Sequence, residues 1–267
     1  MSANLAAMRP VGELLRDWRQ RRRLSQLELA ELADVSPRHV SFVETGRSVP
    51  SRELLIRIAT RLDVPLRERN ALMIAAGYAP IYPQRPLSDR ALAMARDAVR
   101  LVLNGHEPYP ALAVDRHWTM VDANAPVARL VSDADPQLLA PPVNVLRLSL
   151  HPRGLAPRIA NLAQWRAHLL ERLQAQIAAT GDATLIGLLR ELRDYPAPAL
   201  RPGELPAQAG AIVVPLQLDT GAGVLSMIST TTVFGSPVDV TLSELAIEAF
   251  FPSDAASAEL LRSLAGS

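Results

Sequence analysis

The sequence predicts an α+β protein, in which an all-helical domain of five helices precedes a mixed domain built on an antiparallel sheet. Three observations carry this prediction. Residues 1–76 place apolar side chains at helical spacing, with serine or proline where new helices would begin. Short alternating runs occur later, at residues 111–122 and 211–234. Three prolines within residues 79–86 separate the two kinds of pattern.

The first predicted helix covers residues 11–23 and places Leu14, Leu15 and Trp18 on its inner face. It ends in a run of cations formed by Arg19, Arg21, Arg22 and Arg23. Cations at the C-terminus of a helix interact favourably with the helix dipole. The same side chains could also contact a phosphate beside a DNA groove, and the two interpretations are compatible.

Two short helical patterns with a tight turn between them lie within residues 25–51. Ser25 and Ser36 each stand at an N-cap position, and Pro37 falls at the first position of the second helix. A shared apolar seam is formed by Leu29, Ala30, Ala33, Val35, Val40 and Val43. Because the alanines in this seam let the helices approach closely, the pattern predicts a helix-turn-helix.

The second of these helices presents side chains that can reach base edges and thymine methyl groups in a major groove. These outward-facing residues are Arg38, His39, Ser41 and Phe42. Arg47 and Arg52 flank the loop that follows, and we expect them to contact the DNA backbone. The segment therefore predicts a sequence-specific reader of double-stranded DNA.

This segment resembles the helix-turn-helix of phage-repressor and Cro-type (XRE) regulators over about residues 11–80. The matching positions are Ser25-Gln26, Leu29-Ala30, Val35-Ser36, Val40-Ser41, Glu44-x-Gly46 and Pro50-Ser51. The resemblance implies that Gln26 contacts a phosphate and that the major groove is read by Ser36, Pro37, Arg38, Ser41 and Phe42. Asp34 departs from the glycine that the family often has in the turn. Aspartate tolerates left-handed backbone, so we expect the turn to survive.

Two further helices, at residues 52–62 and 66–76, complete a first domain that we assign to residues 1–80. Residues 81–87 are a proline-rich linker. Proline cannot continue a helix and favours a stiff, extended chain. Such a linker suits a molecule in which the conformation of one domain has to affect the other domain.

The second domain, residues 88–267, begins with a predicted helix at 88–103. Two short strands at 111–115 and 118–122 meet at a tight turn of Arg116 and His117. Helices are then predicted at 124–130, 151–179 and 185–193, and strands at 211–218 and 224–234. The segment 242–251 is either strand or helix, because its alternation is weak.

The order strand, turn, strand, helix and later antiparallel strands resembles a PAS-like sensor domain. More narrowly, several motifs resemble the MmyB-like ligand-binding domain. They are His106-Glu-Pro-Tyr-Pro110, Val114-Asp115, Trp118, Asn124, Asn144-x-x-Arg147-x-x-x-x-His151-Pro152, Asn161 and Trp165. The resemblance implies a pocket for a small apolar molecule, with fatty acids as a ligand class, coupled to a repressor-type DNA-binding domain.

A pocket of this kind needs an apolar wall and a few polar anchors. Candidate anchors are His151, Arg153, Arg158 and Asn161, because an arginine can hold a carboxylate with two parallel hydrogen bonds. Candidates for the apolar wall are Trp118, Met120, Trp165, Leu169, Met227 and Ile228. Ordinary core packing explains the helical spacing of Trp165 and Leu169 better than ligand contact does, and Asn124 is better explained as a helix cap.

Composition and motifs exclude several other classes of protein. The chain has no cysteine, so disulfides, thiolate metal sites and cysteine nucleophiles are excluded. It lacks a glycine-rich phosphate loop, a Gly-x-Ser-x-Gly elbow and histidines at metal-ligand spacing, which argues against an enzyme and against a metal cofactor. With no apolar run near 18 residues and no signal-peptide pattern, we expect a cytoplasmic protein without a membrane partner.

The net charge of +1 conceals an asymmetry between the two domains. Residues 1–80 hold 13 arginines and 9 acidic residues, whereas the rest of the chain holds 15 arginines and 18 acidic residues. The basic half is thus the half with the helix-turn-helix, as neutralisation of DNA phosphates requires.

We therefore predict a sequence-specific DNA-binding transcription regulator whose operator affinity is modulated by a small apolar ligand. A homodimer would place two reading helices in successive major grooves of a near-palindromic operator. The alternative is a constitutive DNA-binding regulator whose second domain is a dimerisation or protein-interaction platform without a ligand. An antitoxin-like role is less favoured, because such proteins are usually shorter.

Overall fold

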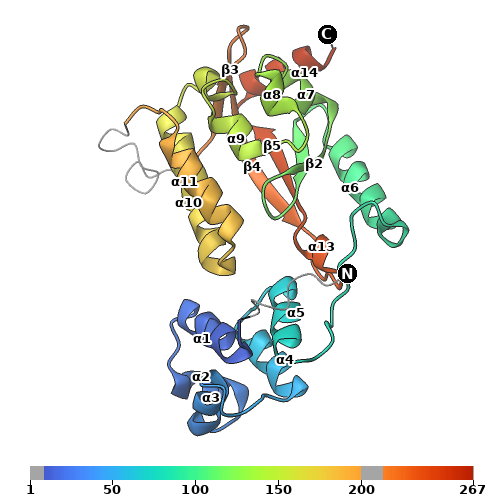
Figure 1. Ribbon diagram of the computed structural model, residues 1–267. Helices are drawn as coiled ribbons and strands as arrows, with labels where there is room; N and C mark the ends of the chain where they lie inside the picture. The colour runs from blue at the N-terminus through green and yellow to red at the C-terminus, as the bar shows by residue number, and fades with distance from the viewer. Residues whose placement is uncertain (1–8, 200–212, 267) are drawn as a thin grey trace. The chain divides into compact units, whose positions relative to one another are not determined.

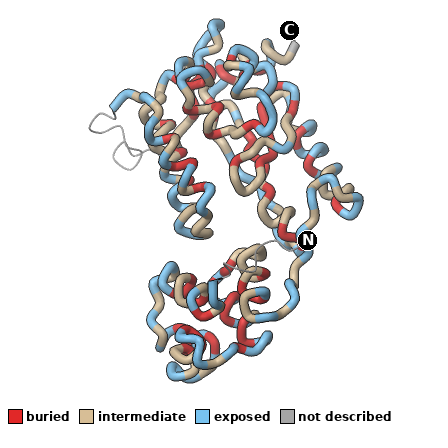
Figure 2. The backbone as a smooth tube through the Cα atoms, viewed as in Figure 1, coloured by how far each residue is buried: buried red, intermediate tan, exposed pale blue. Residues whose placement is uncertain are grey.

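The computed structural model describes residues 9–199 and 213–266, and the chain divides into two compact units (Figure 1). The first unit consists of Met1–Arg85 with the short segments Ala178–Thr180 and Pro237–Val240, and the second unit consists of the remaining chain. Each unit has buried apolar residues of its own (Figure 2). The first two residues of the strand expected at 211–218 lie outside the described residues.

The first unit contains the five helices that the sequence predicts. They are α1 (Val11–Arg21), α2 (Gln26–Ala33), α3 (Pro37–Glu44), α4 (Arg52–Arg61) and α5 (Leu66–Ala75). Their apolar faces meet in one core, in which Leu15, Leu55 and Leu72 are at most 1% exposed. The expectation of an all-helical first domain is confirmed.

Local hydrogen bonds fix the boundaries of α2 and α3. The Ser25 hydroxyl accepts a hydrogen bond from the backbone N–H of Glu28 (3.2 Å), and the Glu28 carboxylate accepts one from the backbone N–H of Ser25 (2.6 Å). At α3, the Ser36 hydroxyl accepts from the backbone N–H of His39 (3.2 Å). Asp34 has φ +52°, so the left-handed turn between the helices forms with aspartate in place of glycine.

The second unit is built on a five-stranded antiparallel sheet with the strand order β2-β1-β5-β4-β3. The strands are β1 (Ala111–Val114), β2 (Met120–Ala123), β3 (Leu216–Asp219), β4 (Val224–Val233) and β5 (Ala246–Pro252). The segment 242–251, which the sequence left open, contains the central strand β5, preceded by the short helix α13 (Val240–Ser243). The α+β fold class is confirmed.

Helices cover both faces of this sheet (Figure 1). On one face α6 (Ala93–Gly105), which follows the short 3-10 helix η2 (Arg90–Leu92), packs Val99 and Leu103 against alternate residues of β1 and β5. On the other face lie α7 (Ala125–Leu130), α9 (Val145–Leu150), α10 (Leu162–Thr180) and α11 (Ala183–Asp194). The C-terminal helix α14 (Ala255–Gly266) contributes Leu261 to the same core as these four helices.

The long helix predicted at residues 151–179 is shorter than expected. Helix α10 begins at Leu162, and the preceding residues form turns and the 3-10 helix η3 (Ala156–Arg158). Pro152 and Pro157 have no backbone N–H to donate within a helix, and a methyl group on Gly154 would overlap the carbonyl oxygen of Leu148. Helices α8 (Pro136–Leu139), α9 and α14 are not evident from the sequence pattern.

Within residues 9–199 and 213–266, none of the helices combines the length and the apolar composition that crossing a membrane requires.

Gly12 provides a test of the packing between α1 and α3. A methyl group at Gly12 would overlap the carbonyl oxygen of Val43 and lie 2.8 Å from that of Glu44. We expect Gly12→Ala to lower the free energy of unfolding by about 2 kcal/mol, because overpacked backbone must move apart. Gly187→Ala in α11 is the control, since that position has open space and alanine favours a helix. Urea unfolding followed by circular dichroism measures both, and an unchanged midpoint for Gly12→Ala would contradict this packing.

Candidate nucleic-acid interface and ligand cavity

The last residue of α3, Glu44, ties three helices of the first unit together. Its side chain is 1% exposed. Arg19 of α1 donates hydrogen bonds from Nε to Oε1 (2.6 Å) and from Nη2 to Oε2 (2.9 Å), and Gln26 of α2 donates from Nε2 to Oε2 (2.8 Å). Arg16 adds a positive charge 3.6 Å from Oε2. These contacts fix the position of α3 against α1 and α2.

The Glu44 carboxylate stays ionised although it is buried. Burial by itself raises the pKa of this group. The hydrogen bonds from Arg19 and Gln26, together with the charges of Arg19 and Arg16, outweigh that effect and hold the pKa of Glu44 below its ordinary value. The same hydrogen bond raises the pKa of Arg19. The pair is therefore a charged element of the folded core at neutral pH.

The outer side of α3 and its flanking residues bring several predicted DNA-contacting residues together. Ser36, Pro37, Arg38, Arg47 and Arg52 are exposed, and Ser41 and Phe42 are half-buried. The guanidinium groups of Arg38 and Arg47 lie 5.1 Å and 5.8 Å from the centre of the Phe42 ring. Cation–π contact of this kind orients two positive groups without neutralising them. This surface can supply both base-reading and phosphate-neutralising groups to a DNA duplex.

Gln26 and His39 differ in how the structure positions them. Gln26 is half-buried, and its hydrogen bond to Glu44 orients the amide beside α3. His39 was expected to face outward, but its Nε2 is buried and has no hydrogen-bond partner in the part of the chain that the structure describes. The ring instead borders a small cavity of about 10 Å³ in the core, together with Val35 and Val43. His39 lies one helical turn before Val43, so both face the interior.

The run of cations at the end of α1 is divided among different contacts. Arg19 forms the buried pair with Glu44. Arg22 donates hydrogen bonds to the carbonyl oxygens of Leu62 (2.7 Å) and Asp63 (2.9 Å), which follow α4. Only Arg21 and Arg23 of this run are exposed. Two of the four arginines therefore hold the helices in place, a role that their spacing in the sequence did not reveal.

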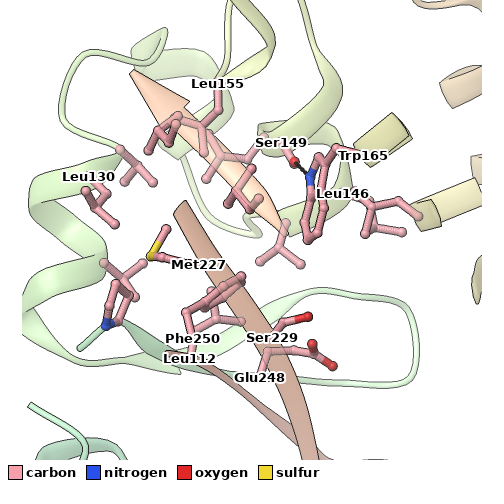
Figure 3. A pocket seen from close by; sticks show the side chains of 18 of the residues that line it. Leu112, Leu130, Leu146, Ser149, Leu155, Trp165, Met227, Ser229, Glu248 and Phe250 are labelled. Atoms are coloured by element: carbon pink, nitrogen blue, oxygen red, sulfur yellow. Dashed lines mark hydrogen bonds between the residues drawn. The ribbon is translucent and has the colours of Figure 1, made fainter. Parts of the chain in front are cut away.

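The second unit encloses a cavity of about 100 Å³ between the sheet and the helices on one of its faces (Figure 3). Of the 21 residues that line it, 17 are apolar. The lining includes the predicted wall residues Trp118, Met120, Trp165, Leu169 and Met227. Ile228 is absent from the lining, because successive residues of β4 point to opposite faces of the sheet. A wall of this composition favours an apolar molecule.

The four predicted anchors do not line this cavity. Arg153 pairs with Asp135, and Arg158 donates to the carbonyl oxygens of Asp219 (2.9 Å) and Leu130 (3.1 Å). The side chain of Asn161 donates to the carbonyl oxygen of Pro215 (2.8 Å), and the Nδ1 atom of His151 accepts from the backbone N–H of Arg153 (3.0 Å). All four lie in the turns before α10 and hold loops together, so the expectation of ligand anchors here is corrected.

The polar groups that do line the cavity were not singled out from the sequence. They are Ser149, Arg172, Ser229 and Glu248. Two signals could have found the ion pair among them. Arg172 lies seven residues after Trp165 in α10, on the same helical face, and Glu248 interrupts the apolar run of the central strand. Both signals become specific only when the fold brings α10 to β5.

A strained turn positions Trp118 at the cavity. Trp118 has φ +65°, an unusual conformation for a bulky residue. The Asp115 carboxylate stabilises the turn by accepting hydrogen bonds from the backbone N–H groups of His117 and Thr119, both at 2.8 Å. The indole then donates from Nε1 to Gln176 (2.8 Å) and lies 5.0 Å below the guanidinium of Arg172.

Among the residues whose positions are described, no group of three or more His, Asp or Glu side chains could hold a metal ion.

Comparison with protein families matches both units. Residues 95–264 match the family described as "MmyB-like transcription regulator ligand binding domain". Residues 15–69 match a family described as "Helix-turn-helix". The cavity thus lies within the first match, and the surface formed by α3 lies within the second.

Several curated proteins are similar to about a fifth of this chain. "Multiprotein-bridging factor 1" of Candida albicans is 35% identical over 60 residues, which is 22% of this chain and 40% of that protein, and its counterpart from Debaryomyces hansenii has the same values. The "ImmF control region 10 kDa protein" of Bacillus phage phi105 is 36% identical over 56 residues, covering 21% of this chain and 62% of the phage protein. The chain therefore spans less than half the length of the first two relatives.

A solved structure titled "Structure of an RNA-binding Light-Oxygen-Voltage Receptor" aligns with 97% of this chain and 62% of that chain. Its sequence identity is 10% and its TM-score 0.26, so it supports no inference.

The buried Glu44–Arg19 pair gives a pH-dependent test. Because the pKa of Glu44 is lower in the folded chain, its contribution to stability is present above the ordinary value of 4.5 and is lost as the pH falls through the folded value. We expect Glu44→Gln to reduce the free energy of unfolding by about 3 kcal/mol at neutral pH, since it leaves Arg19 without its charged partner.

The variant should also lose less stability than the wild type when the pH is lowered below 4.5. Glu31→Gln, at an exposed position of α2, is the control and should keep the wild-type pH dependence. Urea unfolding at a series of pH values measures the three proteins. Parallel curves for the wild type and Glu44→Gln would contradict the charged state of this pair.

Proposed function

Since the chain belongs to the family of MmyB-like transcription regulators and is a DNA-binding transcription regulator, we propose that a small apolar ligand in its second unit modulates its affinity for an operator. Both matched families point to a regulator rather than to an enzyme. The observation that carries the proposal is the cavity, whose 21 lining residues include 17 apolar ones within the matched ligand-binding domain.

The size of the cavity bears on the class of ligand. At about 100 Å³ it is smaller than the roughly 150 Å³ cavity that holds a benzene molecule in another protein. A compound with a longer acyl chain, such as a fatty acid, therefore has to displace wall side chains. Met120 and Met227 can move for this purpose, because methionine is unbranched and has three rotatable bonds.

The DNA side of the proposal rests on α3. Its exposed Arg38 can reach base edges, and Arg47 and Arg52 can neutralise phosphates on either side. A homodimer would place two copies of α3 about 34 Å apart, in successive major grooves of a near-palindromic operator.

Chain connectivity gives the cavity a route to the first unit. Strand β4 carries the cavity residue Met227 and leads into Pro237–Val240, which belongs to the first unit. In this segment Asp239 pairs with Arg85 (3.2 Å), and the backbone N–H of Val240 donates to Pro83 (2.9 Å). A ligand changes operator affinity only if it binds one conformation better than another. A displacement of β4 would therefore also displace this segment, which follows β4 closely in the chain.

The alternative function, a dimerisation or protein-interaction platform without a ligand, is favoured by a different observation. Helix α6 exposes apolar side chains, with Met94 86%, Leu101 75% and Val102 46% exposed. Exposed apolar groups gathered on one helix are typical of an interaction surface. The two functions are compatible in one protein, but only the first requires the cavity to be occupied.

Sequence reading by Arg38 can be separated from phosphate binding by Arg52. We expect Arg38→Ala to weaken binding to the operator by about tenfold to a hundredfold while changing binding to random DNA much less. Arg52→Ala should weaken binding to both DNAs equally and make the salt dependence shallower. Arg190→Ala, on an exposed site of α11, is the control. Fluorescence anisotropy with both DNAs measures the effects, and equal losses for Arg38→Ala would refute base reading.

Occupation of the cavity can be tested by mass spectrometry of an organic extract of the purified full-length protein. We expect an acyl compound near one molecule per chain in the wild type and its loss in Met227→Trp, because the indole would fill the cavity. The control is Ile228→Trp, on the opposite face of β4, which should retain the compound. Retention of the compound by a folded Met227→Trp protein would locate the ligand elsewhere.

A further inference from the structure

We propose that the cavity of the second unit selects an apolar ligand whose polar end is uncharged, such as an alcohol or an ester, over a free carboxylate. This proposal rests on the proposed function. The proposal follows from how Arg172, Glu248 and Ser229 are engaged. It specifies the chemical class of the ligand beyond its apolar chain.

The charges at the cavity wall neutralise each other. Arg172 donates from Nη2 to Oε1 of Glu248 (2.8 Å) and from Nη1 to Oε2 (3.2 Å), a bidentate pair. The side chain of Glu248 is 6% exposed and that of Arg172 27% exposed. Among the described residues, this pair provides the only charged groups in the lining. The cavity therefore presents no net charge to a ligand.

Other contacts hold Arg172 in this arrangement. Its Nη2 atom also donates to the Thr231 hydroxyl (3.0 Å), which in turn donates to Oε1 of Glu248 (2.8 Å). The guanidinium lies 5.0 Å from the centre of the Trp118 ring. Nη1 and Nη2 are thus both engaged with Glu248, so a ligand carboxylate that binds Arg172 has to compete with Glu248.

A ligand carboxylate would have to separate this pair. If it took Arg172 for itself, the buried Glu248 carboxylate would lose its partner and stand next to a second negative charge. Two carboxylates side by side in such a site repel each other, which weakens binding of the ligand. Free fatty acid would therefore bind in competition with an interaction that the protein already makes.

An uncharged polar group meets no such competition at Ser229. Its hydroxyl lines the cavity, and no hydrogen-bond partner for it exists among the residues that the structure describes. Ser229 of β4 lies opposite Phe250, and Thr231, two residues on, lies opposite Glu248. Figure 3 accordingly shows the Ser229 hydroxyl and the Glu248 carboxylate at the same end of the pocket. A ligand hydroxyl or carbonyl can exchange a hydrogen bond with Ser229 and leave the ion pair intact.

The remaining polar group of the lining is also uncharged. The Ser149 hydroxyl accepts a hydrogen bond from Nε1 of Trp165 (3.0 Å) and can still donate one. The hydroxyls of Ser149 and Ser229 can therefore both form hydrogen bonds with an uncharged ligand.

The test compares two probes of equal chain length, decan-1-ol and decanoate, by isothermal titration calorimetry on the full-length protein at pH 8. We expect the alcohol to bind the wild type about tenfold more tightly than the acid, because the acid has to compete with Glu248 for Arg172. In Glu248→Gln, which keeps the shape of the side chain but frees the charge of Arg172, the order should reverse. Ser229→Ala should weaken the alcohol about fivefold through loss of one hydrogen bond.

The outcomes separate this proposal from the proposed function. Equal or tighter binding of decanoate to the wild type would overturn the uncharged head group and leave an apolar ligand site standing. Binding of neither probe, over a series of shorter and longer chains, would overturn both. The wild-type comparison decides alone if Glu248→Gln fails to fold, and Thr231→Val then provides a milder weakening of the same pair.

Discussion

The buried carboxylate of Glu44, held by Arg19, is the constraint on which the first unit depends. An ionised group without water must be matched by donors from its surroundings, and these come from α1 and α2. A buried pair contributes little net stability but tolerates few geometries. We infer that it fixes the orientation of α3, because any rotation of that helix would separate Glu44 from Arg19. The contacts of Glu44 thus place the outer side of α3, with its exposed Arg38, relative to α1 and α2.

The same constraint recurs in the second unit with a different consequence. Glu248 is buried in the central strand, and Arg172 reaches it from α10. In the first unit the neutralised pair lies inside the core, whereas here it lines the cavity. A cavity whose charges are already paired discriminates by shape and by hydrogen bonding.

Local features of the fold could be predicted from the sequence, and features formed by distant residues could not. Ser25, Ser36 and Asp34 determine their caps and turn through contacts within a few residues, so five helices and the helix-turn-helix were predictable. Strand β5 is buried on both faces near Glu248, which removes the alternation that marks a strand. The true polar lining joins α10 to β5 across 76 residues, whereas the predicted anchors were chosen from chemistry without knowledge of that contact.

Coupling between the two units requires only a small difference in free energy. A tenfold change in operator affinity corresponds to about 1.4 kcal/mol, which is the scale of one or two hydrogen bonds. The segment Pro237–Val240 contains contacts of this kind, since Asp239 pairs with Arg85 and its side chain is 3% exposed. Strand β4 joins this segment to the cavity wall without an intervening domain. If a ligand changes operator affinity as proposed, operator DNA changes ligand affinity by the same factor, because linkage is reciprocal.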